Sequence, residues 1–191
     1  MRWRSNSLRC MHSLQPLREP DAVRVVFAIA LLVAWIGAWA ATDDELAALM
    51  QQAMRGDAQA RSTLEDNARA GNVTAAHLLG HLHLRGKGVL RSDSKAIEWF
   101  DRAAQQGHVE SMHNLGVIHE RAPKAKRDLE AARRWYRAAA EAGFARAQAN
   151  LGQLLADGRG GPADLVEARA WIEKSALQRE PRGQYLLGML F

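Results

Sequence analysis

The segment Lys95–Gly107 reads KAIEWFDRAAQQG, a single tryptophan inside an alanine-rich run. The same arrangement returns as AARRWYRAAAEAG at 131–143 and as EARAWIEKSALQR at 167–179. The three tryptophans, Trp99, Trp135 and Trp171, are therefore separated by 36 residues in both intervals (135 − 99 and 171 − 135). A fixed period of this length is the signature of a repeat protein, in which each unit buries its apolar face against the next one.

A Leu-Gly pair keeps the same period four times, at 79–80, 115–116, 151–152 and 187–188. Within each unit the apolar residues have helical spacing in two separate halves. Glycines stand between the halves, and Ser92 or Asp93 can cap the second helix. Each unit is thus predicted to be a helical hairpin, and the chain an all-α solenoid of stacked antiparallel hairpins.

The glycine of each Leu-Gly pair falls in a helix interior, where glycine costs ~1 kcal/mol relative to alanine. Its recurrence predicts that the paired helix approaches closely at this point. We expect the tryptophans to fill the gap between successive hairpins as core residues rather than to stack on a ligand. The predicted structural core of the repeats comprises Leu79, Gly80, Trp99, Leu115, Gly116, Trp135, Leu151, Gly152, Trp171, Leu187 and Gly188.

The segment Ala75–Gly107 resembles the Sel-1-like repeat, a relative of the tetratricopeptide repeat. The matching residues are Ala76, Leu79, Gly80, Gly86, Gly88, Val89, Asp93, Lys95, Ala96, Trp99, Ala103, Ala104 and Gly107. The resemblance implies a right-handed α-solenoid that recognises other proteins.

The period divides the chain into a helix pair at 41–71 as an amino-terminal cap, three repeats at 72–107, 108–143 and 144–179, and a truncated fourth repeat at 180–191. The second repeat lacks the loop glycines and has Pro123 in its loop. The family's tyrosine position holds His83, His119 and Leu155. We expect both histidines to be buried or half-buried packing residues whose hydrogen bonds are satisfied.

Residues 1–40 have the composition of a secretory leader. Arginines precede a run of seventeen uncharged residues that starts at Val25, and Ala38-Trp39-Ala40 forms an A-x-A cleavage site. The start is Met1 or Met11. We expect cleavage after Ala40 and a periplasmic or secreted protein. The alternative is an uncleaved inner-membrane anchor, because seventeen apolar residues are at the lower limit of a membrane span.

The charge and cysteine content exclude several classes of function. The sequence carries a net charge of +5, but five basic and two acidic residues lie in the first 40 positions. The remainder has 21 basic and 19 acidic groups, too balanced to predict nucleic-acid binding. Cys10, the only cysteine, lies in the leader, so no disulfide framework or thiolate chemistry is expected in the mature chain.

A polar stripe runs beside the buried face of the first helix of each repeat, and we call it the polar lane. By resemblance to tetratricopeptide hairpins, these helices line a concave groove. Side-chain amides both donate and accept hydrogen bonds, which suits the backbone of an extended peptide. We expect the polar lane to bind a partner protein or peptide segment, through His77, His81, Glu110, His113, Asn114, Arg146, Asn150 and Gln153. The alternative is a solvated face that binds nothing.

The histidines of the lane suggest a second, different function. His77 and His81 are one helical turn apart and His113 lies one repeat further on, so three imidazoles could converge on zinc, completed by Glu110 or Glu120. No recognised metalloprotease, serine-hydrolase or phosphate-binding motif is present in the sequence. The leading prediction is therefore a non-enzymatic exported adaptor without metal or cofactor, and the alternative is a metal-binding or hydrolytic periplasmic protein.

Overall fold

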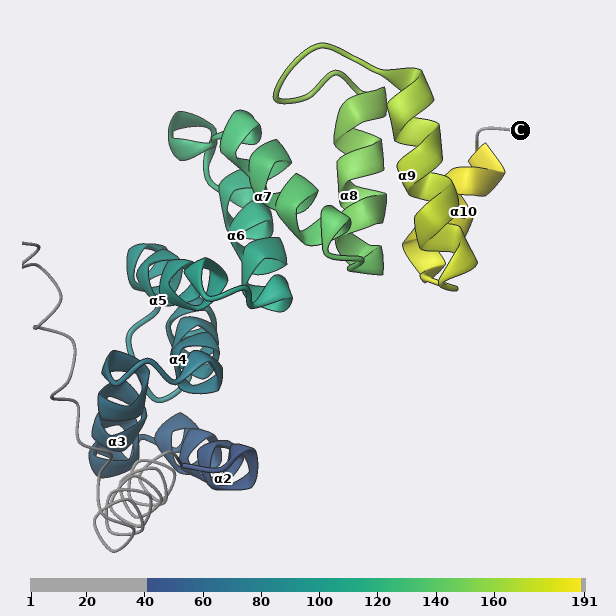
Figure 1. Ribbon diagram of the computed structural model, residues 1–191. Helices are drawn as coiled ribbons and strands as arrows, with labels where there is room; N and C mark the ends of the chain where they lie inside the picture. Colours follow the sequence, from purple (N-terminus) through teal and green to yellow (C-terminus); the bar gives the residue numbers. More distant parts are fainter. Residues whose placement is uncertain (1–40, 190–191) are drawn as a thin grey trace, which may run out of the picture. The chain divides into compact units, whose positions relative to one another are not determined.

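The computed structural model describes residues 41–189, and this range contains α-helices and one 3₁₀ turn but no strand (Figure 1). The helices pair as hairpins, and consecutive helices pack against each other along the chain. The predicted all-α repeat solenoid is confirmed. The helices are α2 (Asp43–Met54), α3 (Ala58–Arg69), α4 (Val73–Arg85), α5 (Asp93–Gln105), α6 (Val109–Arg121), α7 (Leu129–Glu141), α8 (Ala145–Ala156), α9 (Leu165–Leu177) and α10 (Pro181–Met189), with the 3₁₀ turn η1 (Lys124–Lys126) between α6 and α7.

The described residues from Thr42 onward belong to one compact unit. The predicted leader, 1–40, lies outside the described residues. Within the described part of the chain, no helix is long and apolar enough to cross a bilayer.

The second helix of every repeat begins at a side-chain cap that keeps the 36-residue period. Ser92, Asp128 and Asp164 each accept a hydrogen bond from the backbone N–H three residues further on. Such a cap satisfies one of the N–H groups that the first turn of a helix leaves without a partner. Of the two candidates predicted for α5, Ser92 is the cap.

Two loop glycines allow one hairpin to contact the backbone of the hairpin before it. A Cβ atom at Gly88 would lie 1.9 Å from the carbonyl oxygen of Ala53, and one at Gly160 would lie 2.2 Å from that of Leu129. No side chain fits at these separations. The second repeat has Lys124 at the equivalent position, and there the chain forms η1 instead.

The helix-interior glycines accommodate the residue that follows each tryptophan. A Cβ atom at Gly80 would lie 2.5 Å from the Phe100 ring, one at Gly116 2.6 Å from Tyr136, and one at Gly152 2.6 Å from Ile172. Phe100 and Tyr136 are fully buried, and Ile172 is 2% exposed. The close approach predicted from the glycines thus occurs within each hairpin.

Trp135 and Trp171 pack between hairpins. Trp135 of α7 lies against a buried cluster that includes Ala96 and Phe100 of the preceding repeat. Trp171 of α9 lies against a cluster built largely from α7 and α8. Its indole N–H also donates to Glu167, which pairs with Arg137 of α7. Trp99 is 7% exposed.

Two predicted packing assignments need correction. Leu187 is half-buried and Gly188 is exposed, with no atom within 4 Å of a Cβ built on it, because no described helix follows α10 to cover this face. His83 is buried as expected and has a hydrogen bond with the Leu90 backbone, but its Nδ1 atom has no hydrogen-bond partner among the described residues, so only one of its two ring nitrogens is satisfied.

Candidate functional site

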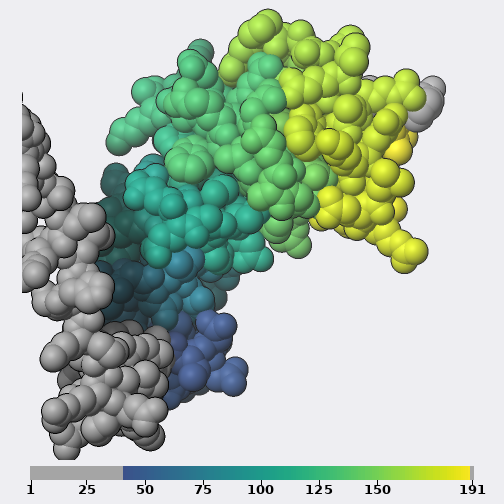
Figure 2. All heavy atoms as spheres, viewed as in Figure 1, coloured from purple at the N-terminus to yellow at the C-terminus, as the bar shows by residue number. Residues whose placement is uncertain are grey.

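The structure places the polar lane on the first helices α4, α6 and α8. His77 and His81 lie on α4, and both are half-buried. The remaining lane residues are Glu110, His113 and Asn114 on α6 and Arg146, Asn150 and Gln153 on α8. Glu110 and Arg146 are exposed, and the other four are half-buried. In the space-filling view, the described residues run in chain order from blue through teal and green to yellow (Figure 2).

The lane amides bond to imidazoles of the preceding repeat. Asn114 Nδ2 donates to His81 Nε2 at 3.3 Å, and Asn150 Nδ2 donates to His113 Nε2 at 3.2 Å. Each amide uses one N–H in this way and keeps its carbonyl oxygen and second N–H as bonding groups. The sequence predicted these residues as ligand-binding groups, but it did not predict that they also join successive repeats.

His113 lies in an aromatic and basic environment. Its ring centroid is 5.7 Å from that of Tyr136 and 5.2 Å from that of Phe144. Burial, opposed by a hydrogen bond with Asn114 and assisted by nearby arginines, Arg146 first among them, lowers the pKa of His113 from 6.5 to about 4. His113 is therefore a neutral hydrogen-bond acceptor at physiological pH.

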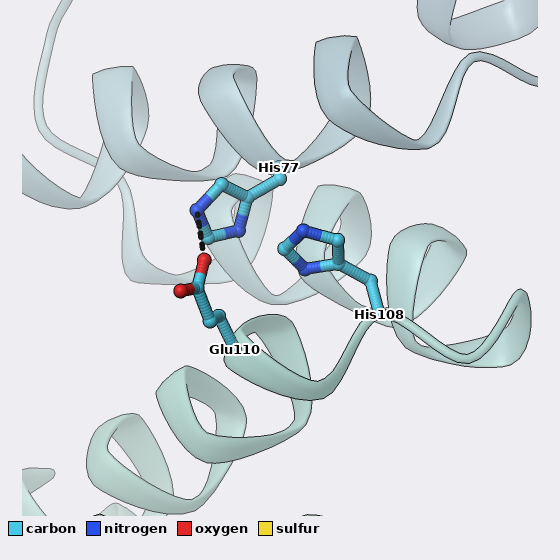
Figure 3. A group of neighbouring side chains, drawn as sticks. All are labelled: His77, His108 and Glu110. Atoms are coloured by element: carbon cyan, nitrogen blue, oxygen red, sulfur yellow. Dashed lines mark ion pairs between the residues drawn. The ribbon is translucent and has the colours of Figure 1, made fainter. Parts of the chain in front are cut away.

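The histidine group differs from the predicted one. Among the described residues, the ligand atoms that lie within 4.8 Å of one another belong to His77, His108 and Glu110, while His81 and His113 are not in the group (Figure 3). His113 is directed to Tyr136 and Phe144 instead. Sequence reasoning missed His108, which caps α6 at the position one repeat after the Asn72 cap of α4. The 36-residue spacing between Asn72 and His108 is the sequence signal that could have identified His108 as a residue at this position.

His77 is the most perturbed member of this group. Burial, then the neighbouring His81 and His108, lowers the pKa of His77 from 6.5 to about 3. Its Nε2 atom lies 3.8 Å from a Glu110 carboxylate oxygen, and because the ring is neutral at physiological pH this contact is not an ion pair there. The Ser111 hydroxyl, 2.9 Å from His77 Nδ1, belongs to a fully buried residue and so cannot reach an external substrate as a nucleophile.

A cavity of about 500 Å³ opens at the carboxy-terminal end of the lane, and we call it the basic pocket. Its lining includes five arginines and two glutamates, an excess positive charge of three. Arg182 of α10 stands one repeat after Arg146, so the basic column of the lane continues into α10. The pocket is lined by His113, Val117, Glu120, Arg121, Arg127, Tyr136, Arg146, Asn150, Arg159, Glu180 and Arg182.

The floor of the basic pocket is fixed by hydrogen bonds. Tyr136 donates its hydroxyl to Glu120 at 2.8 Å, and Arg159 donates to the other carboxylate oxygen at 3.0 Å. Burial and the Glu120 charge raise the pKa of Tyr136, so its hydroxyl stays a donor. Glu180 lies 3.7 Å from Arg146. The two glutamates are thus already paired, which leaves the cationic excess available to an incoming anionic group.

The sequence profile of the Sel1 repeat matches residues 73–108, 109–144 and 145–179, together more than half of the chain. The chain belongs to the Sel1 repeat family. These matches begin one residue later than the repeats expected from the period. Sel1 repeats generally bind other proteins and are generally not catalytic.

Two solved structures resemble this Sel1 repeat protein. A Sel1 repeat protein from Oxalobacter formigenes is 34% identical, with a TM-score of 0.59, and the match covers 65% of this chain and 94% of the other. A protective antigen of uropathogenic Escherichia coli with an SLR fold is 28% identical, with a TM-score of 0.65. That match covers 69% of this chain and 28% of the antigen. A comparison with curated proteins finds no match.

Proposed function

We propose that this Sel1 repeat protein is an exported adaptor that binds an extended, acidic segment of a partner protein along the polar lane, with the basic pocket as its anchor. The observation that carries the proposal is the basic pocket itself, which opens where the lane residues of α6 and α8 meet α10. Anionic side chains or a carboxyl terminus would complement the excess positive charge of the pocket, and bidentate arginine–carboxylate pairs are among the stronger polar contacts.

The lane supplies the second part of the recognition. Asn114 and Asn150 stand one repeat apart, and each is held by the imidazole of the preceding repeat. Such fixed amides lose little conformational freedom when they bind a peptide backbone. Apolar contact is small here, so charge and hydrogen bonding give the specificity, and binding should weaken as the salt concentration rises.

Affinity capture from envelope extract tests the proposal. The wild type is compared with Arg146→Glu/Arg182→Glu, which reverses two charges of the basic pocket, and captured proteins are quantified by mass spectrometry. We expect a partner that the wild type retains and the variant loses. Asn114→Ala/Asn150→Ala should weaken the same capture.

The matched control is Arg91→Glu/Arg134→Glu, with the same charge change at arginines outside the pocket whose side chains are 69% and 66% exposed. If the control loses the partner as completely as the pocket variant does, the partner recognises the overall charge of the protein and not the basic pocket. Equal capture by the wild type and the pocket variant would place the interface elsewhere on the solenoid.

Export is the other part of the proposal, and the leader composition of residues 1–40 supports it. Amino-terminal sequencing of protein isolated from the native envelope tests it. A mature chain that starts at Ala41 is expected. An intact leader in the membrane fraction would favour the anchored alternative, and recovery from the cytoplasm would contradict export.

A further inference from the structure

In the group formed by His77, His108 and Glu110, two hydrogen-bond acceptors, His77 Nε2 and a Glu110 carboxylate oxygen, face each other. His77 lies on α4, His108 caps α6, and Glu110 lies in the first turn of α6 (Figure 3). This group lies between the first and second repeats, away from the basic pocket, whose lining includes none of its members.

The hydrogen bonds of Ser111 determine which ring nitrogen of His77 carries its proton. Ser111 Oγ lies 2.9 Å from His77 Nδ1 and 3.0 Å from His108 Nδ1, and the hydroxyl has one proton for these two contacts. His108 Nδ1 also accepts the Ser111 backbone N–H, so it carries no proton. His77 Nδ1–H therefore donates to Ser111 Oγ, which leaves a lone pair on His77 Nε2.

That lone pair faces a carboxylate at a separation slightly longer than that between two ligands of one zinc ion. His77 Nε2 and Glu110 Oε2 are 3.8 Å apart, longer than the ~3.2 Å upper limit of a good N–H···O hydrogen bond. With Zn–N and Zn–O bonds of ~2.0–2.2 Å at tetrahedral angles, two ligands of one zinc ion stand roughly 3.3–3.6 Å apart. The spread of the whole group, up to 4.8 Å, exceeds this range by about 1 Å, so the ligands must move closer on binding, and the Glu110 side chain is 60% exposed and free to adjust.

We propose that His77, His108 and Glu110 bind one Zn²⁺ ion, with water at the fourth position. Two imidazoles and a carboxylate with an open position form a recognised zinc ligand set, and imidazole favours zinc over calcium or magnesium. When His108 carries its proton on Nδ1, both rings donate to the Ser111 oxygen. The proton shift breaks the 3.2 Å bond from the Ser111 N–H and requires the Ser111 hydroxyl proton to turn to another acceptor. Ser111 is then a positioning residue for both ligands.

Titration of the metal-free, tag-free protein with zinc chloride tests the site, by isothermal calorimetry at neutral pH and by thermal unfolding. Cobalt(II) absorption in the visible range checks for four-coordinate geometry. We expect one equivalent of Zn²⁺ and a raised unfolding temperature. Glu110→Gln should weaken binding at least tenfold, and Ser111→Ala should weaken it by ~10–100-fold.

The decisive variant is His108→Asn, because asparagine is a strong N-cap and already caps α4 at the equivalent position. It removes an imidazole while keeping the helix start. Its controls are His119→Asn and Glu130→Gln, which change the same residue types outside the group. Loss of binding in His108→Asn with retention in both controls is the expected result. No binding by the wild type, or undiminished binding by His108→Asn, would overturn the proposal.

Discussion

At the scale of single residues, the fold depends on glycines that face a bulky side chain. Gly116 packs against Tyr136, because a Cβ atom at Gly116 would lie 2.6 Å from the nearest atom of the tyrosine ring. Gly188 has open space around it. Both glycines occupy the same position of the repeat and both lie in helices. The pair therefore separates the packing role of this glycine from its intrinsic cost in a helix.

Gly116→Ala is expected to lower the free energy of unfolding by about 1–3 kcal/mol, because the added methyl group forces the Tyr136 ring or the α6–α7 spacing to shift. Gly188→Ala is expected to be neutral or to stabilise by up to ~1 kcal/mol, since only helix propensity changes there. Urea unfolding of both variants measures the difference. Equal effects at the two positions would show that close approach is not the reason for the glycine.

The half-buried histidine His113 makes stability depend on pH. Its pKa is about 4 in the folded protein and close to 6.5 when unfolded, so between these values the unfolded chain binds more protons. Stability contributed by the neutral ring is complete above pH 6.5 and is lost as the pH falls toward 4. His113→Gln should reduce the slope of unfolding free energy against pH by up to ~1.4 kcal/mol per pH unit in this window. Slopes that are identical in wild type and variant would contradict the assignment.

At the scale of elements, each repeat starts its second helix at one capping position. Asp128 accepts from the Ala131 N–H at 2.8 Å. Asp128→Ala should cost ~1 kcal/mol of stability, whereas Asp128→Asn should cost little, because asparagine caps as well as aspartate. Thermal unfolding of the two variants checks this. A loss in Asp128→Asn as large as in Asp128→Ala would show that charge, not capping, matters at this position.

The hairpins, their caps and the glycine contact follow from the sequence because they repeat every 36 residues and depend on local spacing. Contacts that cross from one repeat to the next were harder to predict. The period alone did not show that Asn114 bonds His81, or that Phe100 rather than Trp99 meets Gly80. His108 was missed because histidine is an unusual cap, and its contact with His77 depends on how closely α4 and α6 approach.

At the scale of the whole molecule, two features lie along one line of first helices. The histidine group joins α4 to α6, and the basic pocket joins α6 and α8 to α10. A solenoid distributes such sites along its length, because each repeat contacts only its neighbours. Zinc binding at the histidine group is therefore expected to leave partner binding at the basic pocket largely unchanged.

Photo-crosslinking in native envelope preparations tests most directly whether the polar lane is the partner-binding face. A benzophenone amino acid is placed at Arg146, in the basic pocket, or at Arg134, on α7, two positions with side chains that are 69% and 66% exposed. We predict a discrete crosslinked partner from position 146 and none from position 134. A partner crosslinked from position 134 alone would contradict the proposal that this face recognises the partner.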